Sequence, residues 1–394
     1  MAVKKVFFLF SCFTGLFFSL SLFAESPKTP SDFHSRIAQA YQEFFKDQKS
    51  GAEFFERLIE DNPDEYLIYD GYAQALIHRS DFETAKKILQ RALERVPAKS
   101  PELLENIQSR MAVLEEIKSF QATLRGAMPW KQAKLFGTAH FAFRTNFPEA
   151  YAMKIAEKLE RYLAKEKEIL EDIFKMRVED FPYTLVYLTG RPEDYQDLLA
   201  ERKAKGDAIP SVPVAGYFSS FDNSFIIYFD GISDERTLAH EMAHFLIHNG
   251  FIAHPSPVFD EGLAEYIAIQ VVKESIRWDL LWRLKTMDWT YNQGGYQSVD
   301  EIFESGKRYF SKGHPREGNA FYFGAWTLVH YFLKGNGPFF KSFFQQWLKY
   351  EKENALNTFE STEIFFKDNL TAEQKNKLDD GWIRHFLHLT YEKI

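Results

Sequence analysis

Apolar residues recur at spacings of three and four along residues 31–125, a stretch with few glycines and prolines. That period places apolar side chains on one face of a helix. The sequence therefore predicts a helical region here. The period is lost from Gly126 to Gly137, which we interpret as a linker to a second part of the chain.

Beyond this linker the pattern changes to short apolar runs flanked by turn residues. These runs predict strands at residues 138–145, 183–189, 212–219 and 224–230, with Asp222-Asn223 as the turn between the last two. Between them we expect a long amphipathic helix at residues 148–175, and a loop with a short helix at residues 190–206. After Ser233 nearly all of the chain has a helical period. Because the strands come first and the helices last, the predicted fold class is α+β.

One stretch of the helical region has the spacing of a repeat of about 34 residues with two helices. The residues that fall at this spacing are Tyr69, Tyr72, Ala73, Leu76, Ala85, Leu89, Ala92 and Pro97. This pattern resembles a tetratricopeptide repeat, and the preceding residues echo its second half. The resemblance implies a surface in residues 31–125 that binds a protein partner. A plain layer of helical hairpins that covers the rest of the protein is the alternative.

The first residues of the chain have the pattern of an export signal. Lys4 and Lys5 precede a nearly unbroken apolar run at residues 6–23, and Ala24 is followed by polar residues. This order predicts a signal peptide over residues 1–24 and a periplasmic or secreted protein. An uncleaved membrane anchor at residues 6–23 is the alternative. No later segment is long and apolar enough to predict a membrane span.

Composition narrows the classes of function. The 394 residues are 45% hydrophobic and 26% charged, which is typical of a globular chain of two or three domains. The net charge is -8, and removal of two lysines with residues 1–24 leaves 46 basic against 56 acidic residues. This acidic balance argues against a nucleic-acid partner. The single cysteine, Cys12, excludes intramolecular disulfides and cysteine-ligated metal sites.

The strongest chemical signal is His240-Glu241-Met242-Ala243-His244, which has the pattern H-E-x-x-H. On a helix, residues four apart share one face, so His240 and His244 can bind one zinc ion. Glu241 lies about 100° around the helix from His240, beside the open coordination position. There it can take a proton from a zinc-bound water as a general base.

A second motif, Asp260-Glu261-Gly262-Leu263-Ala264-Glu265-Tyr266, follows at short range. Together the two motifs resemble the gluzincin zinc metallopeptidases, which include the thermolysin-like and membrane-alanyl-aminopeptidase families and peptidase MA-like domains. The resemblance implies that Glu261 is the third zinc ligand and that Glu265 holds a ligand imidazole. The reverse assignment, with Glu265 as ligand, stays open. It also implies a zincin-like catalytic domain at residues 135–275, with a small mixed sheet and active-site helices, and a helical subdomain at residues 276–394.

Two further sites follow from the resemblance. Ala215 and Gly216 fall where the family has a strand at the sheet edge that pairs with substrate, although an ordinary strand with a bulge is the alternative. Tyr322 matches a tyrosine that donates to the oxyanion, although a core aromatic residue is the alternative. His248 continues the helical series, but Ile247 and Gly250 occupy the positions where metzincins need glycine and histidine. We therefore expect His248 to be a packed or hydrogen-bonded helix residue.

The leading hypothesis is an exported zinc-dependent peptidase, most simply an endopeptidase, that acts on peptide or protein substrates. The alternative from another class is a non-catalytic binding or scaffold protein with a structural or vestigial zinc site. Three protein ligands leave one coordination position open, which is the catalytic arrangement. A deformylase-type hydrolase needs a cysteine ligand, and the mature chain would have no cysteine.

Overall fold

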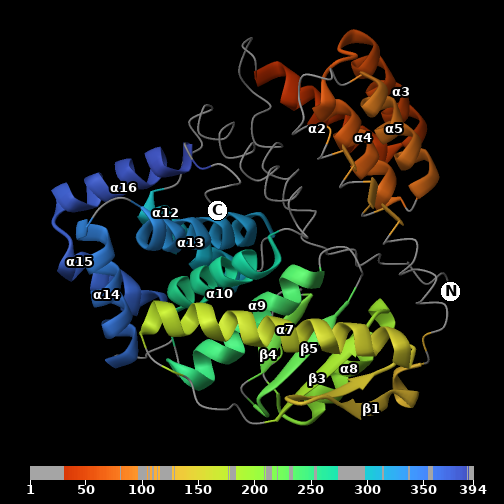
Figure 1. The fold of residues 1–394 in the computed structure, drawn as a ribbon. Coiled ribbons are helices and arrows are strands. Elements are labelled where there is room, and N and C mark those ends of the chain that lie inside the picture. The colour runs from red at the N-terminus through yellow and green to blue at the C-terminus, as the bar shows by residue number, and fades with distance from the viewer. Residues whose placement is uncertain are drawn as a thin grey trace. The chain divides into compact units, whose positions relative to one another are not determined.

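The computed structural model describes most of the chain from residue 31 onward (Figure 1). The described residues are 31–79, 81–95, 104, 107–108, 111–112, 114–115, 127, 129–175, 177, 183–207, 209, 215–219, 221–229, 234–252, 255–273, 298–312, 315–335, 338–353, 358–387 and 389. The predicted signal peptide lies outside them. The chain divides into two compact units, residues 1–122 and 123–394. None of the helices in the described part of the chain has the length and apolar character needed to cross a bilayer.

The first unit contains two helical hairpins. Helix α2 (Ser31–Lys46) packs against α3 (Gln48–Asp61), and α4 (Tyr66–His78) packs against α5 (Phe82–Arg95). The predicted pair of helices at the repeat-like stretch is confirmed, since Ala73 and Ala85 are fully buried between them. Small side chains at these positions let paired helices approach closely. The rest of the predicted helical region, residues 96–125, lies mostly outside the described residues.

The second unit is built around one mixed five-stranded sheet. Its strands are β1 (Lys134–Gly137), β2 (Phe141–Thr145), β3 (Thr184–Thr189), β4 (Gly216–Ser219) and β5 (Ser224–Tyr228), in the spatial order β1-β2-β3-β5-β4. β2, β3 and β5 run parallel, whereas β1 and β4 are antiparallel to their neighbours. The α+β class is thus confirmed, and so is the turn at Asp222-Asn223. β4 lies at one edge of the sheet.

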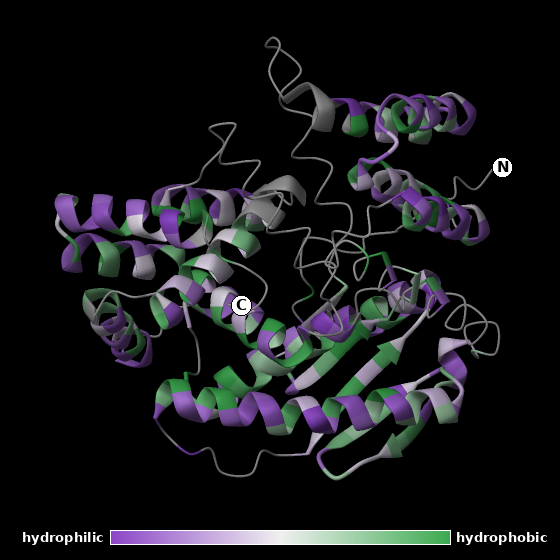
Figure 2. Cartoon of the chain, turned by 45° about the horizontal axis from the view of Figure 1, so that its top comes forward, coloured by the Kyte–Doolittle hydropathy of each residue, from purple (hydrophilic) through white to green (hydrophobic). Residues whose placement is uncertain are grey.

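Helices cover both faces of this sheet. Helix α8 (Pro192–Ala204) contributes Tyr195 and Leu198 to a buried cluster with Tyr187 and Ile226 of the central strands. Because side chains alternate along a strand, the neighbouring residues point to the other face of the sheet and contact α9 (Asp234–Gly250). There the rings of Phe225 and Phe245 lie 5.3 Å apart. Helix α7 (Glu149–Phe174) packs against β2 and α9. In Figure 2 the strands are largely green, whereas the long α7 alternates purple and green along its length.

Three boundaries differ from the sequence predictions. The predicted linker at residues 126–137 contains β1, whose mostly exposed residues leave no alternating pattern to recognise. The predicted strand at residues 138–145 begins only at Phe141, because the Thr138 N–H donates to the Phe141 carbonyl and closes the turn between β1 and β2. The predicted short helix at residues 190–206 is α8, whose first turn is acidic and whose last turn is basic. Trp130, buried with the α8 cluster, also belongs to this unit.

In the described part of the chain, the helices after α10 (Pro257–Val272) pack on it or on α13. They are α12 (Val299–Lys312), α13 (Pro315–Lys334), α14 (Pro338–Glu353), α15 (Phe359–Asn369) and α16 (Ala372–Leu387). Helix α10 is apolar on nearly every side, because it packs against α9 on one flank and α13 on the other. Gly262 permits the second contact: a Cβ there would lie 2.6 Å from the Ala325 carbonyl oxygen and 2.8 Å from Val329.

We expect Gly262→Ala to lower the free energy of unfolding by about 1–3 kcal/mol, because α10 and α13 would have to separate. Chemical denaturation followed by circular dichroism measures the change. Gly71→Ala in α4 is the matched control, since its new Cβ meets the end of the Ile37 side chain at 2.9 Å and otherwise ordinary contacts. Equal stability of the two variants would contradict this account of the α10–α13 contact.

Candidate metal centre

Helices α9 and α10 bring the residues of both sequence motifs together. His240 and His244 lie one turn apart on the face of α9 that meets α10, while Leu238 and Met242 are buried in the core. Helix α10 starts with Ser256 as its N-cap residue and Pro257 in the first turn, and it presents Glu261 and Glu265 to the same face. The site therefore forms where two helices, each with its polar residues spaced along one face, pack against each other.

The potential ligand atoms of His240, His244 and Glu261 form a compact triangle. His240 Nε2 lies 3.0 Å from both His244 Nε2 and Glu261 Oε2, and His244 Nε2 lies 3.3 Å from Glu261 Oε2. Zinc ligands at bond lengths of about 2.0–2.2 Å stand roughly 3.3–3.6 Å apart around a tetrahedral ion. A small outward movement of the three side chains would therefore accommodate a metal ion. Two imidazoles and a carboxylate are also a donor set that suits zinc.

The far nitrogen of each imidazole contacts a carboxylate. His240 Nδ1 lies 3.1 Å from Glu265 Oε2, and His244 Nδ1 lies 2.9 Å from Asp260 Oδ1. Such contacts fix the ring orientation and tautomer, so that Nε2 of each ring is free for a metal. Glu265 touches the side of His240 that faces away from His244. The geometry therefore favours Glu261 over Glu265 as the ligand.

Two members of this site were missed by the sequence analysis. Asp260 holds His244, and its other oxygen lies 2.9 Å from His248 Nε2, so His248 is hydrogen-bonded as expected. Arg236, one turn before His240, forms an ion pair with Glu265. The sequence could have indicated Asp260, because it directly precedes the predicted ligand Glu261 on α10 and can therefore reach His244. His244, His248 and Asp260 also form a second group of potential ligand atoms, all within 4.8 Å of one another.

The site gathers acidic and basic side chains that are largely removed from water. Burial disfavours the charged form of Asp260, but His244 and His248 outweigh it and hold the pKa of the carboxyl well below its usual range. Burial likewise opposes the charged form of His240, whose pKa the Glu261 and Glu265 carboxylates raise to about 9. With neutral imidazoles, the carboxylates of Glu241, Asp260, Glu261 and Glu265 face one guanidinium, that of Arg236. A divalent cation would offset most of this charge.

Glu241 lies in the second position of the motif, buried and close to the edge of the sheet. The backbone of Phe218 in β4 acts to lower the pKa of the Glu241 carboxyl, but burial outweighs this effect. Burial raises its pKa, while His240 and His244 act in the opposite direction. A carboxylate with a raised pKa is a better proton acceptor, so Glu241 has the properties of a general base.

Tyr322 lies at this site, and β4 packs against α9 next to it. The hydroxyl of Tyr322, from α13, lies 3.5 Å from Glu261 Oε1, and its ring centroid lies 6.1 Å from that of His240. Gly216 packs against α9, where a Cβ would meet Thr237 at 3.2 Å. Ala215 instead pairs with β5, since its carbonyl accepts from the Tyr228 N–H at 2.7 Å. The register of β4 on β5 is regular and contains no bulge.

Comparison with known proteins adds no assignment. No family model matches this chain, and no curated protein does. The interpretation of the site therefore depends on the geometry of its residues.

Glu261→Gln should lower the bound Zn²⁺ sharply when the protein is loaded with the ion and dialysed, because the variant loses a charged ligand atom. Glu265→Gln should reduce affinity less, by about 10–100-fold, because it only loosens His240. Elemental analysis and competition with a chelator measure the two effects. Full Zn²⁺ in Glu261→Gln together with loss in Glu265→Gln would reverse the ligand assignment.

Proposed function

We propose that this protein is an exported zinc-dependent peptidase. The observation that carries the proposal is the triangle of His240, His244 and Glu261 beside the buried Glu241. The triangle leaves one side of a tetrahedral ion open to water or substrate, which is typical of catalytic zinc sites. Zinc bound there would polarise the scissile carbonyl and lower the pKa of a bound water. The pattern of residues 1–24 supports export.

Glu241 performs the proton transfers in this mechanism. Its carboxylate takes a proton from the attacking water and returns it to the leaving amine. Removal from bulk water keeps the pKa of Glu241 higher than that of an exposed carboxyl, which helps the transfer.

Tyr322 acts on the oxygen of the scissile carbonyl. Burial and the nearby Glu261 raise the pKa of the phenol well above its usual value, so the hydroxyl keeps its proton. A protonated hydroxyl donates to the oxyanion of the tetrahedral intermediate. Contact with Glu261 keeps this donor close to the site.

The edge of β4 supports a peptide as the substrate. Ala215 pairs with β5, and the alternation of an antiparallel ladder turns the backbone groups of Gly216 and Phe218 away from β5. Gly216 is buried, whereas Phe218 is partly exposed. An extended peptide can add to such an edge through main-chain hydrogen bonds. Backbone groups bind a peptide at any point along its length, so an endopeptidase is the form of the activity that we favour. Residues 31–125 are a candidate surface for recruitment of the substrate or another protein partner.

Glu241→Gln should keep Zn²⁺ and the fold but lower hydrolysis of an unstructured protein such as casein by about 10²–10⁴-fold, because an amide cannot accept the proton. Glu235→Gln is the matched control on the same helix. Its carboxylate contacts Lys158 and Tyr162 of α7, outside the triangle, so activity should persist. Activity of Glu241→Gln close to that of the unsubstituted protein would exclude the mechanism and favour the non-catalytic alternative.

Tyr322→Phe should lower kcat by about 10²-fold with unchanged Zn²⁺ content, as expected for loss of one oxyanion donor. Tyr309→Phe provides the comparison, because the ring of Tyr309 lies 5.8 Å from that of Tyr322 in the same cluster. Steady-state kinetics on one peptide would separate the two residues. An equal effect of both substitutions would assign Tyr322 a packing role only.

A further inference from the structure

A carboxylate from a distant part of the chain holds the start of α10. Ser256 is the N-cap residue of this helix, but its side chain makes no capping hydrogen bond within the helix. Its backbone N–H instead donates to Glu351 Oε2 at 2.7 Å, and its hydroxyl donates to Glu351 Oε1 at 2.6 Å. Glu351 belongs to α14 and follows Ser256 by 95 residues. One side chain of α14 therefore accepts from both donors of the residue that starts α10.

This contact is shielded from water. Ser256 is fully buried, and Glu351 is 2% exposed. Trp347, one turn earlier on α14, donates from Nε1 to Glu351 Oε1 at 2.9 Å, and the Thr362 hydroxyl of α15 contacts the Ser256 hydroxyl. The Phe259 ring, in the first turn of α10, lies 5.0 Å from that of Trp347. Because water is excluded, a displacement of Ser256 would leave buried donors unpaired.

One helical turn connects Ser256 to the metal centre. The Asp260 N–H donates to the Ser256 carbonyl at 2.9 Å, as expected for the first hydrogen bond of a helix. The Asp260 carboxylate lies 2.9 Å from His244 Nδ1, and the next residue is the predicted ligand Glu261. An unbroken series of hydrogen bonds therefore runs from α14 through Ser256 and Asp260 to His244.

Asp260 and Glu261 lie close to a helix end, where the backbone is least restrained. The first four N–H groups of a helix have no acceptor within it, and terminal turns open more readily than the middle. The two residues stand four and five positions after Ser256, within this part of α10. A metal site needs its ligands held within about 0.5 Å of the productive geometry. The start of α10 therefore needs an anchor outside the helix, which the Glu351 carboxylate supplies.

We propose that Glu351 is a positioning residue for the metal centre, because it fixes the first turn of α10 and with it the places of Asp260 and Glu261. The inference rests on the function proposed above, since it concerns the zinc site of that function. Within the described residues, the hydrogen bonds of the Glu351 carboxylate go to Ser256, Trp347 and Thr362, none of which is a predicted ligand. Its effect on a bound ion therefore passes through Ser256 and the backbone of α10.

The test removes this anchor and compares the result with an equal disturbance beside it. Glu351→Met keeps an unbranched side chain of similar length and removes the carboxylate. Ser256→Ala is a milder variant that keeps the hydrogen bond from the backbone N–H and loses the one from the hydroxyl. Thr362→Val is the matched control, because it removes a hydroxyl from the same buried network and leaves both Ser256–Glu351 hydrogen bonds in place.

Three quantities are measured on the full chain. They are the Zn²⁺ affinity by competition with a chelator, the free energy of unfolding of the metal-free protein, and the hydrogen exchange of the Asp260 and Glu261 amides. We expect Glu351→Met to lower Zn²⁺ affinity by about 10–100-fold, as for other residues that hold a ligand in place without touching the ion. Ser256→Ala should lower it less, and Thr362→Val should lower stability with unchanged affinity.

Unchanged Zn²⁺ affinity in Glu351→Met, or an equal loss in Thr362→Val, would overturn the proposal. An equal loss would mean that affinity follows overall stability, which is a structural role only. If Glu351→Met does not fold, the comparison of Ser256→Ala with Thr362→Val decides in the same way.

Hydrogen exchange separates this inference from the proposed function. If the unsubstituted protein binds no Zn²⁺, the peptidase proposal fails, but exchange of the Asp260 amide still measures its hydrogen bond to Ser256. Faster exchange in Glu351→Met and Ser256→Ala, with unchanged exchange in Thr362→Val, supports the positioning role. Exchange that is the same in all three variants contradicts it.

Discussion

The contact between α9 and α10 is the constraint on which the rest of the second unit depends. Both helices bury charged or ionisable side chains at their interface, and a buried charge is tolerated only when it meets a partner. Here His240 contacts the carboxylates of Glu261 and Glu265, and His244 contacts that of Asp260. Glu265 also forms an ion pair with Arg236. The helices can therefore pack only in the register that brings these groups together, and that register creates the candidate metal centre.

The helices after α10 stabilise this register from outside. Glu351 of α14 accepts from the Ser256 N–H at 2.7 Å and from the Ser256 hydroxyl at 2.6 Å, at the first residues of α10. Trp347 donates to the same carboxylate at 2.9 Å, so the buried Glu351 has several hydrogen-bond donors. Farther along, the absence of a side chain at Gly262 brings α13 close to α10, and with it Tyr322. The C-terminal helices thus determine where α10 begins and which residues face the site.

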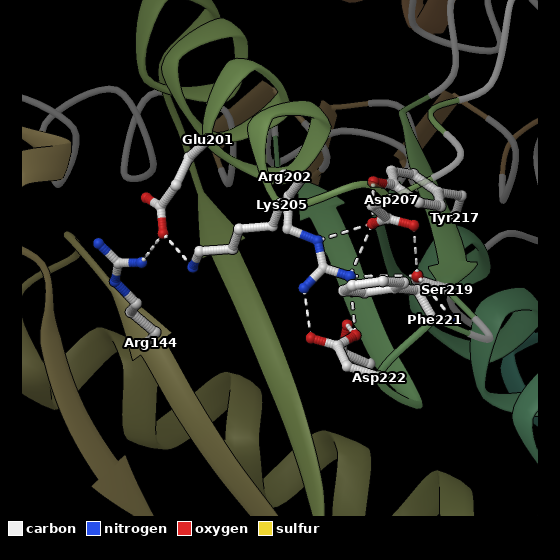
Figure 3. A network of polar contacts seen from close by, with 10 residues as sticks. Arg144, Glu201, Arg202, Lys205, Asp207, Tyr217, Ser219, Phe221 and Asp222 are labelled. Atoms are coloured by element: carbon white, nitrogen blue, oxygen red, sulfur yellow. Dashed lines mark hydrogen bonds and ion pairs between the residues drawn. The ribbon is translucent and has the colours of Figure 1, made fainter.

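Local patterns in the sequence predicted the parts of the structure that depend on local spacing. His240 and His244 on one helical face, and Glu261 on the next helix, follow from residues close together in the chain. β1 could not be found, because a mostly exposed edge strand has no apolar alternation. The contacts of Arg202 with Asp207 and Asp222 could not be found either (Figure 3), since both acids stand in connecting segments and only the tertiary fold brings them to α8. The gluzincin resemblance and the zinc ion stay predictions, which the geometry supports but does not test.

The burial of Glu166 makes the free energy of unfolding of this protein depend on pH. It lies fully buried in α7, neither of its oxygens has a hydrogen-bond partner among the described residues, and burial raises its pKa well above the usual value. Where its folded pKa lies above the ambient pH, folding takes up a proton at Glu166. Between the unfolded and folded pKa values, each pH unit of increase then lowers the contribution of this residue to the free energy of unfolding by about 1.4 kcal/mol. Asp260 and Glu261 have the opposite dependence, because their lowered pKa values favour folding above the pKa of the unfolded chain. Glu166 in α7 and the two carboxylates Asp260 and Glu261 therefore have opposite pH dependences, and the pH of greatest stability is a compromise between them.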